Sequence, residues 1–293
     1  MQVGQPGGEE EMYGANSALV RHLDSLRDRG LRDGTIYKRW RTIMHLRDWL
    51  GQDILTVTHD DLTCYLDREL SLEARATAIT QLRGFYQWCL LEGLVDADPT
   101  IRLIRPRLPR RLPRPMPEDD VALALTAAPT YRIRPAIAFA ACAGLRAFDM
   151  HSLNRHDLHS FDDPPIIFIP EQKGGDEGTV PLSDELITIL AGCDLPDQGP
   201  LFVRSDERGG GRLPPHGISQ SVNAFLHDLG ISHTLHSLRH RFGTQSYQAS
   251  GRDLRQTQEL LRHRSVSSTQ IYSYVDPGER SAIVNRLPQI VTQ

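Results

Sequence analysis

LLRHRSVSSTQIYSYV, residues 260–275, carries the most specific pattern in this sequence. It places His263 ahead of a Ser-rich turn, followed by a Thr-x-x-Tyr sequence that ends at Tyr272. Tyr274 comes two residues later, and two positions apart on a helix point to nearly opposite faces. Only one of the two tyrosines can therefore face a shared site, and the Thr-x-x-Tyr spacing favours Tyr272.

Upstream, HSLRH at 236–240 falls in a segment of helical periodicity. His236 and Arg239 are three residues apart and project from one helical face, whereas His240 is expected to point elsewhere. A guanidinium beside a titratable imidazole suits a phosphodiester, because one neutralises oxyanion charge and the other moves a proton. A metal site that includes His233 is an alternative, but no carboxylate ligand accompanies it and Arg239 would lie against the cation.

Further upstream, GLRAFDMHSL at 144–153 follows an apolar helical segment. Arg146 and Asp149 are three residues apart, so the carboxylate can orient the guanidinium from the same face. An ordinary surface ion pair would show the same spacing. This motif gains weight only from its neighbours.

The chain has only two lysines, Lys38 and Lys173, among its 33 Lys and Arg residues. Lys173 lies in EQKGGDEGTVPL, a hairpin predicted between strands at 165–170 and 179–182. A solvated turn residue is the simplest interpretation. However, an ammonium can give a proton to a leaving alkoxide, whereas a guanidinium is a poor general acid. Lys38 is expected to contact backbone phosphate or solvent.

Positive charge is concentrated in one segment, although the formal net charge is -4 and rules out a uniformly basic coat. Residues 101–117, IRLIRPRLPRRLPRPMP, hold six Arg and five Pro and no acid. Proline at this density favours an extended connector, and the localised charge favours contact with a polyanion. The candidates for this polyanion contact are Lys38 and the arginines Arg102, Arg105, Arg107, Arg110, Arg111 and Arg114.

A length of 293 residues favours two domains. The start of the chain is acidic and Gly-rich, unlike a signal peptide, and no apolar run is long enough to span a membrane. The four cysteines are widely spaced without a CxxC pair, which fits reduced thiols in a cytoplasmic protein.

The expected fold is mainly α. Residues 1–14 are predicted to be a disordered tail, and 15–100 to form a bundle of four helices, with the second at 35–50, the third ending near 70 and the fourth at 71–91. After the linker at 101–117, residues 118–275 are expected to combine helices with a small antiparallel sheet, including a last helix at 266–275. The tail at 276–293 is a candidate for contact with a neighbouring protomer.

These motifs together resemble the tyrosine recombinase (phage integrase) family. The region 141–153 resembles the first Arg box of the family, and 236–240 matches its His-x-x-Arg box. The hairpin at 171–182 is similar to its lysine-bearing hairpin, and 260–275 to its closing signature. By domain plan, 15–100 resembles a core-binding (SAM-like) domain and 118–275 an α+β catalytic domain. Only about 14 residues precede the bundle, so a simple form without an arm-binding domain is expected.

The resemblance implies that Arg146 and Arg239 clamp the scissile phosphate and that Tyr272 is the nucleophile. A phenol has a pKa of about 10, so it needs a base or cationic neighbours to react at neutral pH. Two arginines supply charge stabilisation that divalent metals otherwise give. Neither a metal, ATP nor another cofactor is expected.

By the same resemblance, His236 is the proton acceptor, Lys173 protonates the 5′-oxygen leaving group and His263 holds a phosphate oxygen. Asp149 supports the site in place of the commoner Glu. Arg262 stands where the family has glycine before the histidine, and is expected to add a cation near DNA.

The implied activity is site-specific recombination of duplex DNA through a 3′-phosphotyrosyl intermediate, as in a phage integrase or a Xer-like resolution enzyme. A homotetramer on two DNA sites would exchange strands through a Holliday junction, with room for an accessory DNA-bending or directionality factor. Two alternatives stay open: a catalytically silent DNA-binding protein on the same fold, and a metal-dependent nuclease.

Overall fold

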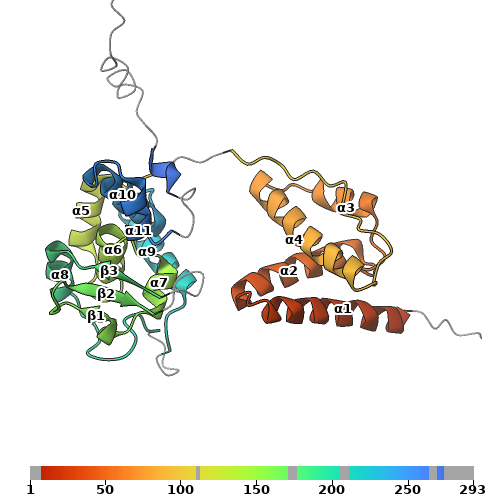
Figure 1. Ribbon diagram of the computed structural model, residues 1–293, viewed down its shortest axis with the longest axis horizontal. Coiled ribbons are helices and arrows are strands. Elements are labelled where there is room, and N and C mark those ends of the chain that lie inside the picture. Colours follow the sequence, from red (N-terminus) through yellow and green to blue (C-terminus); the bar gives the residue numbers. More distant parts are fainter. Residues whose placement is uncertain (1–7, 110–112, 171–176, 205–210, 264–268, 274–293) are drawn as a thin grey trace, which may run out of the picture. The chain divides into compact units, whose positions relative to one another are not determined.

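The computed structural model describes residues 8–109, 113–170, 177–204, 211–263 and 269–273. The chain divides into two compact units, Met1–Arg110 and Arg111–Gln293 (Figure 1). The boundary lies inside the Arg/Pro-rich segment of the sequence. Each unit has its own hydrophobic core.

The first unit is a bundle of the helices α1 (Gly8–Asp28), α2 (Asp33–Leu50), α3 (His59–Leu66) and α4 (Leu72–Leu91). Local signals set its helix ends: Gly51 closes α2 with a positive φ of 64°, and the Thr58 and Asp61 side chains cap the start of α3 reciprocally. The core is formed by apolar faces at helical spacing, including Leu26, Ile43, Leu46, Leu82 and Phe85.

Two expectations about this unit are wrong. The predicted tail at 1–14 overlaps α1, which already begins at Gly8. The sequence over 8–14 contains no proline and no β-branched residue, so an established helix can extend through it without new nucleation. The third helix ends at Leu66 rather than near residue 70, and the chain then turns so that the Arg68 guanidinium lies 3.7 Å from the centroid of the Tyr65 ring.

The start of the Arg/Pro-rich segment packs against the bundle. Leu103 is only 7% exposed and belongs to the bundle core, and its carbonyl oxygen accepts a hydrogen bond from Arg83. Arg105 Nε lies 3.3 Å from Thr80 Oγ1 on α4. This part of the segment is therefore held on the first unit rather than extended in solvent.

The bundle core also buries a histidine, His22, which is 1% exposed. Its ring packs edge-on against Phe85, with 5.3 Å between centroids, and neither ring nitrogen has a hydrogen-bond partner among the described residues. Burial, followed by the charges of Arg39 and Arg29, lowers the pKa of His22 to about 4. The unfolded chain therefore binds a proton here more tightly than the folded chain.

We expect this histidine to make the first unit acid-sensitive. Its contribution is complete above the unfolded pKa of about 6.5 and is lost as the pH falls toward 4, so about 2–3 kcal/mol should disappear by pH 4.5. His22→Leu should remove that part of the loss. Urea unfolding followed by tryptophan fluorescence measures it, because all 3 tryptophans lie in this unit.

The matched control is His45→Leu, at an exposed histidine of the same unit. This variant should keep the wild-type dependence on pH. Identical losses in wild type and His22→Leu between pH 7 and 4.5 would contradict the prediction.

The second unit is built around α6 (Ile133–Cys142), whose residues 135–141 are all buried. This helix is surrounded by other helices, which explains why residues 135–141 are apolar on every side. Those neighbours are α5 (Glu118–Ala127), α7 (Ala147–Ser152), α8 (Asp184–Ala191), α9 (Pro215–Asp228) and α10 (Leu235–Ala249). The helix α11 (Leu254–Leu260) packs against α10.

A small antiparallel sheet lies below α6 and α10 in Figure 1, in the strand order β1-β2-β3. Its strands are β1 (Leu158–His159), β2 (Ile166–Ile169) and β3 (Gly178–Pro181), and Ile167 of β2 pairs with Val180 of β3. The two predicted strands are thus present and β1 is an addition. The expected fold class, mainly α with a small antiparallel sheet, is confirmed.

The predicted last helix at 266–275 is wrong in its described part. Residues Gln270–Ser273 form a short 3₁₀ turn, η3. Within it, the Tyr272 amide donates a hydrogen bond of 3.0 Å to the Thr269 carbonyl. Local periodicity could not distinguish this turn from an α-helix, because its side chains are positioned by contacts with α10. Across the described chain, no helix has the length and apolarity needed to cross a bilayer.

Candidate active site

Separate parts of the second unit meet at one place: the start of α7, the first turns of α10, the turn from α11 to His263, and η3 with the preceding Thr269. They bring together five residues that the sequence singles out, namely Arg146, Asp149, Arg239, His263 and Tyr272. The cluster contains three basic groups, one carboxylate and one phenol. Such a set can bind an oxyanion and present a nucleophile to it.

Arg239 holds two of these segments together. Its side chain is 2% exposed and donates one hydrogen bond to the Gly144 carbonyl, just before α7, and another of 2.6 Å to the Leu261 carbonyl, just after α11. Burial, followed by the nearby charges of Arg146 and Arg262, lowers the pKa of this guanidinium. The lowered pKa of about 9 still leaves the guanidinium protonated at neutral pH.

Asp149 is fully buried and serves two partners through one oxygen. Oδ2 accepts the backbone N–H of Arg146 at 2.9 Å and lies 2.9 Å from the guanidinium of Arg262. The side chain of Arg146 lies farther away, at 3.9 Å. Asp149, which was expected to orient the guanidinium of Arg146, thus binds the backbone N–H of Arg146 and forms its closer ion pair with Arg262.

Arg262, expected to add a cation near DNA, does not project into solvent. Its side chain is 6% exposed and turned inward to Asp149. A buried carboxylate strongly favours an opposite charge beside it, which explains why this arginine leaves the surface.

His240, expected to point away from the site, contacts the predicted nucleophile instead. Its Nδ1 lies 3.2 Å from Tyr272 Oη, and the centroids of the His240 and His236 rings are 4.5 Å apart. The reason is the four-residue spacing of the two histidines, which places them on one helical face. Burial, then the charges of His236 and Arg239, lowers the pKa of His240 to about 4, so it is neutral and able to accept a proton at pH 7.

Tyr272 and His263 lie parallel to one another. The two rings are stacked at 12°, with 6.4 Å between centroids, and His263 Nδ1 is 2.9 Å from Thr269 Oγ1. Burial, then Arg239 and Arg146, lowers the pKa of His263 to about 3, so this imidazole is neutral at pH 7. Burial raises the pKa of Tyr272, and the charges of Arg239 and Arg146 oppose that effect.

Gly243 on α10 is a site residue that the sequence did not reveal. A methyl group at this position would lie 2.5 Å from Cζ of Tyr272, well inside van der Waals contact. Only glycine lets the phenol ring pack this closely against the helix. A glycine inside a predicted helix is the one signal that could have drawn attention to it.

The remaining predicted residues fall into two groups. Lys173, Arg110, Arg111 and Tyr274 lie outside the described residues. The side chains of Lys38, Arg102, Arg105, Arg107 and Arg114 are exposed.

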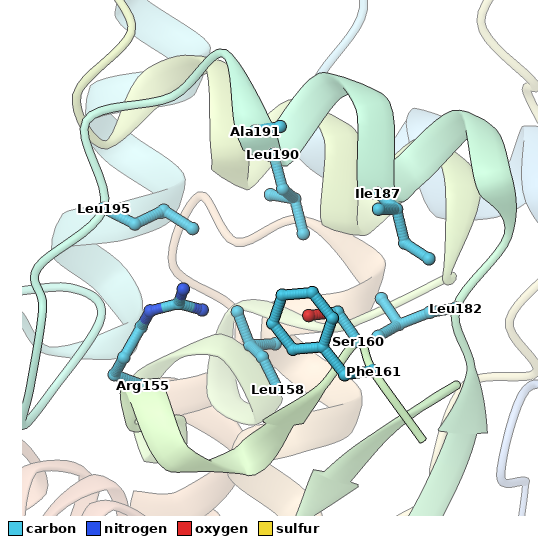
Figure 2. Close-up of a pocket in the computed structure, with 9 residues that line it drawn as sticks. All are labelled: Arg155, Leu158, Ser160, Phe161, Leu182, Ile187, Leu190, Ala191 and Leu195. Carbon is cyan, nitrogen blue, oxygen red and sulfur yellow. The ribbon is translucent and has the colours of Figure 1, made fainter. Parts of the chain in front are cut away.

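The described part of the chain holds no group of three or more His, Cys, Asp or Glu side chains that could bind a metal ion. It does hold an apolar pocket of about 280 Å³ elsewhere in the second unit. Figure 2 shows Ile187 and Leu190 extending from α8 toward Leu158 and Phe161. This pocket lacks the charged groups of the Tyr272 cluster and is not the candidate site.

Comparison with known proteins places this arrangement in context. Residues 114–279 match the phage integrase family. The chain is 31% identical over 279 residues to tyrosine recombinase XerD of Pseudomonas aeruginosa, covering 88% of this chain and 92% of that protein. It is 30% identical over 221 residues to tyrosine recombinase XerA of Pyrococcus furiosus, covering 74% of each.

Among solved structures, a lambda integrase (75-356) dimer bound to a COC' core site superposes with a TM-score of 0.69 at 19% identity, covering 86% of this chain and 96% of that one. This likeness supports the fold. Together with the sequence relatives, it defines the class of protein: a site-specific DNA recombinase of the tyrosine type. The chain belongs to the phage integrase family.

Proposed function

We propose that this enzyme cuts and rejoins duplex DNA with Tyr272 as its nucleophile. The observation that carries the proposal is the position of Tyr272 Oη, 3.2 Å from the neutral His240 and in the electrostatic field of Arg146 and Arg239. Oη would attack the phosphorus and displace the 5′-oxygen, leaving a 3′-phosphotyrosyl bond. A 5′-hydroxyl from a partner strand would reverse the step and regenerate the phenol.

The two arginines would act differently on the scissile phosphate. Arg239 is buried and already donates to two carbonyl oxygens, so it would contribute a fixed positive charge. The Arg146 side chain is 24% exposed and is the guanidinium that incoming DNA can reach. His263 would hold a phosphate oxygen, as the resemblance implies. Because Tyr272 is only 6% exposed, DNA has to displace part of its cover before Oη meets phosphorus.

Proton transfer would involve both histidines of α10. His240 touches Oη and would receive its proton as the new P–O bond forms. His236, which is exposed and 4.5 Å from His240, would pass it to solvent. By resemblance, Lys173 would give a proton to the departing 5′-oxygen.

We further propose that the first unit and the Arg/Pro-rich segment bind the DNA backbone as a core-binding domain, with the second unit as the catalytic domain. Two open grooves flank α4, each about 620–630 Å³. The cations that line them are Lys38, Arg41 and Arg68 in one and Arg29, Arg39, Arg83 and Arg105 in the other. Such contacts make DNA affinity fall steeply with salt.

A homotetramer on two DNA sites is proposed as the active assembly. A lambda integrase tetramer bound to a Holliday junction superposes with a TM-score of 0.69 at 18% identity, covering 90% of this chain and 84% of that one. The sequence relatives named Xer support a role in resolving DNA molecules, and the lambda integrase structures support a role in DNA integration; the proposal includes both reactions. We also propose that the enzyme acts in the cytoplasm and that an accessory DNA-bending or directionality factor assists it.

A covalent trapping assay tests the proposed function. Duplexes selected from a randomised pool for binding would be nicked beside each candidate cleavage position, so that cleavage releases a short fragment and religation fails. We expect a covalent protein–DNA adduct in the presence of EDTA, with the DNA attached to Tyr272 by peptide mass spectrometry. The absence of an adduct, or its loss in EDTA, would contradict the proposal.

The same assay tests the close packing of Gly243 on Tyr272. Gly243→Ala should slow adduct formation about 100-fold. The added methyl group would push the phenol ring away from α10 and so misalign the nucleophilic oxygen. The change should otherwise favour the helix by about 0.5–1 kcal/mol, since alanine has the higher helix propensity. The clash with the buried phenol ring opposes that gain, so the rate of adduct formation, and not thermal stability, is the measurement that tests this contact.

Gly34→Ala is the matched control, because a methyl group on Gly34 in α2 meets nothing within 4 Å. Its adduct should form at the wild-type rate. An unchanged rate in Gly243→Ala would show that the ring of Tyr272 does not need this contact.

A further inference from the structure

Arg262 adopts a backbone conformation that side-chain-bearing residues rarely occupy. Its φ is 50°, in the left-handed region that glycine tolerates best. The related motif has glycine here. An arginine in such a position needs a compensating interaction of its own.

That interaction is the ion pair with Asp149, 113 residues earlier in the chain. Arg262 and Asp149 are 6% and 0% exposed, and the guanidinium lies 2.9 Å from Oδ2. Charged partners this deeply buried are held firmly, because separating them would leave an isolated charge in the protein interior. The pair therefore ties the turn after α11 to α7.

The pair also changes which arginine Asp149 neutralises. The site contains three guanidiniums, Arg146, Arg239 and Arg262, and among the residues that the structure describes Asp149 is the carboxylate that lies beside them. Since Asp149 lies 2.9 Å from Arg262 and 3.9 Å from Arg146, most of its charge is countered by Arg262. Arg146 keeps more of its positive charge for another anion.

We propose that Arg262 is a positioning residue for strand cleavage: by binding Asp149 it leaves Arg146 to the scissile phosphate and holds His263 beside Tyr272. This inference rests on the proposed function, because it takes from there the contacts of Arg146 and His263 with phosphate. His263 directly follows Arg262, so a shift of this turn moves the imidazole with it. The charge of Arg262 also contributes, after burial, Arg239 and Arg146, to the lowered pKa of His263.

Three substitutions separate this role from simple packing. Arg262→Gly removes the ion pair and suits the left-handed backbone. Arg262→Lys keeps the charge, and Asp149→Asn removes the carboxylate while an amide oxygen can still accept the Arg146 N–H. Each would be measured for the single-turnover rate of adduct formation at saturating DNA, and for DNA affinity in a Tyr272→Phe background.

We expect Arg262→Gly and Asp149→Asn each to lower the saturated rate about 30- to 100-fold, with DNA affinity changed less than about 3-fold. Arg262→Lys should recover about a tenth of the wild-type rate or more. The double variant Arg262→Gly/Asp149→Asn should be no slower than either single variant, because both remove one interaction. In Arg262→Gly the pKa of His263, measured by NMR titration, should rise.

Arg252→Gly is the matched control. Arg252 also has a positive φ, of 71°, but lies in the exposed turn after α10. It should cleave at the wild-type rate. If Arg262→Gly did not fold, Arg262→Lys and Asp149→Asn would carry the same test.

Two results would overturn the inference: a wild-type cleavage rate in folded Arg262→Gly, or a loss confined to DNA affinity, which would make Arg262 a direct DNA contact. Failure of the proposed function is distinguishable, because the wild-type protein would then form no adduct at Tyr272.

Discussion

Tyr272→Phe should form no covalent adduct with DNA. The substitution removes the oxygen that would bond to phosphorus, and no rotation of the ring can replace it, so the cleavage rate should fall by at least about 10⁴-fold. DNA affinity should stay within about 2-fold, because the hydroxyl contacts His240 rather than solvent. Loss of that one hydrogen bond should lower the free energy of unfolding by only about 0.5–1.5 kcal/mol.

The matched control is Tyr274→Phe, which removes the same atom two residues away. Its adduct should form at close to the wild-type rate, with the DNA still attached to Tyr272. An adduct that persists in Tyr272→Phe and disappears in Tyr274→Phe would reverse the assignment of the nucleophile.

Arg239→Lys should slow cleavage about 10²- to 10³-fold although the charge is kept. The planar guanidinium of Arg239 reaches the Gly144 and Leu261 carbonyls at once, whereas a single ammonium on a flexible stem can serve one of them. The two segments would then move apart, and the charge would leave the position where the phosphate gains negative charge. One buried carbonyl without a partner should also cost about 1–3 kcal/mol of stability.

This prediction needs cleavage to be measured where the variant is fully folded, as shown by its thermal unfolding curve. Arg255→Lys provides the control, because Arg255 is 74% exposed and pairs with Glu259 on the surface of α11. A surface change of this kind should alter stability by less than about 0.5 kcal/mol and leave the cleavage rate unchanged. Wild-type cleavage by folded Arg239→Lys would show that the fork geometry is dispensable.

The motifs of the site were readable from the sequence because each is local. Arg239 lies three residues after His236, and Tyr272 three after Thr269, and these spacings are visible without a fold. The apolar helical segment expected just before Gly144 corresponds to α6. Secondary structure was predicted less well where it depends on tertiary packing or on the extension of an existing helix. The segment around Tyr272 is a 3₁₀ turn positioned by α10, and α1 begins as early as Gly8.

By itself, the sequence determined the fold class, the family and the chemical groups of the site. These follow from hydrophobic periodicity and from short motifs, which are properties of neighbouring residues. Only the tertiary structure decided which groups meet. The Asp149 carboxylate lies closer to the guanidinium of Arg262 than to that of Arg146, His240 touches Tyr272, and Gly243 makes room for the phenol. Each contact joins segments far apart in the chain, so it depends on how helices pack, and burial then selects the partner that leaves no charge alone.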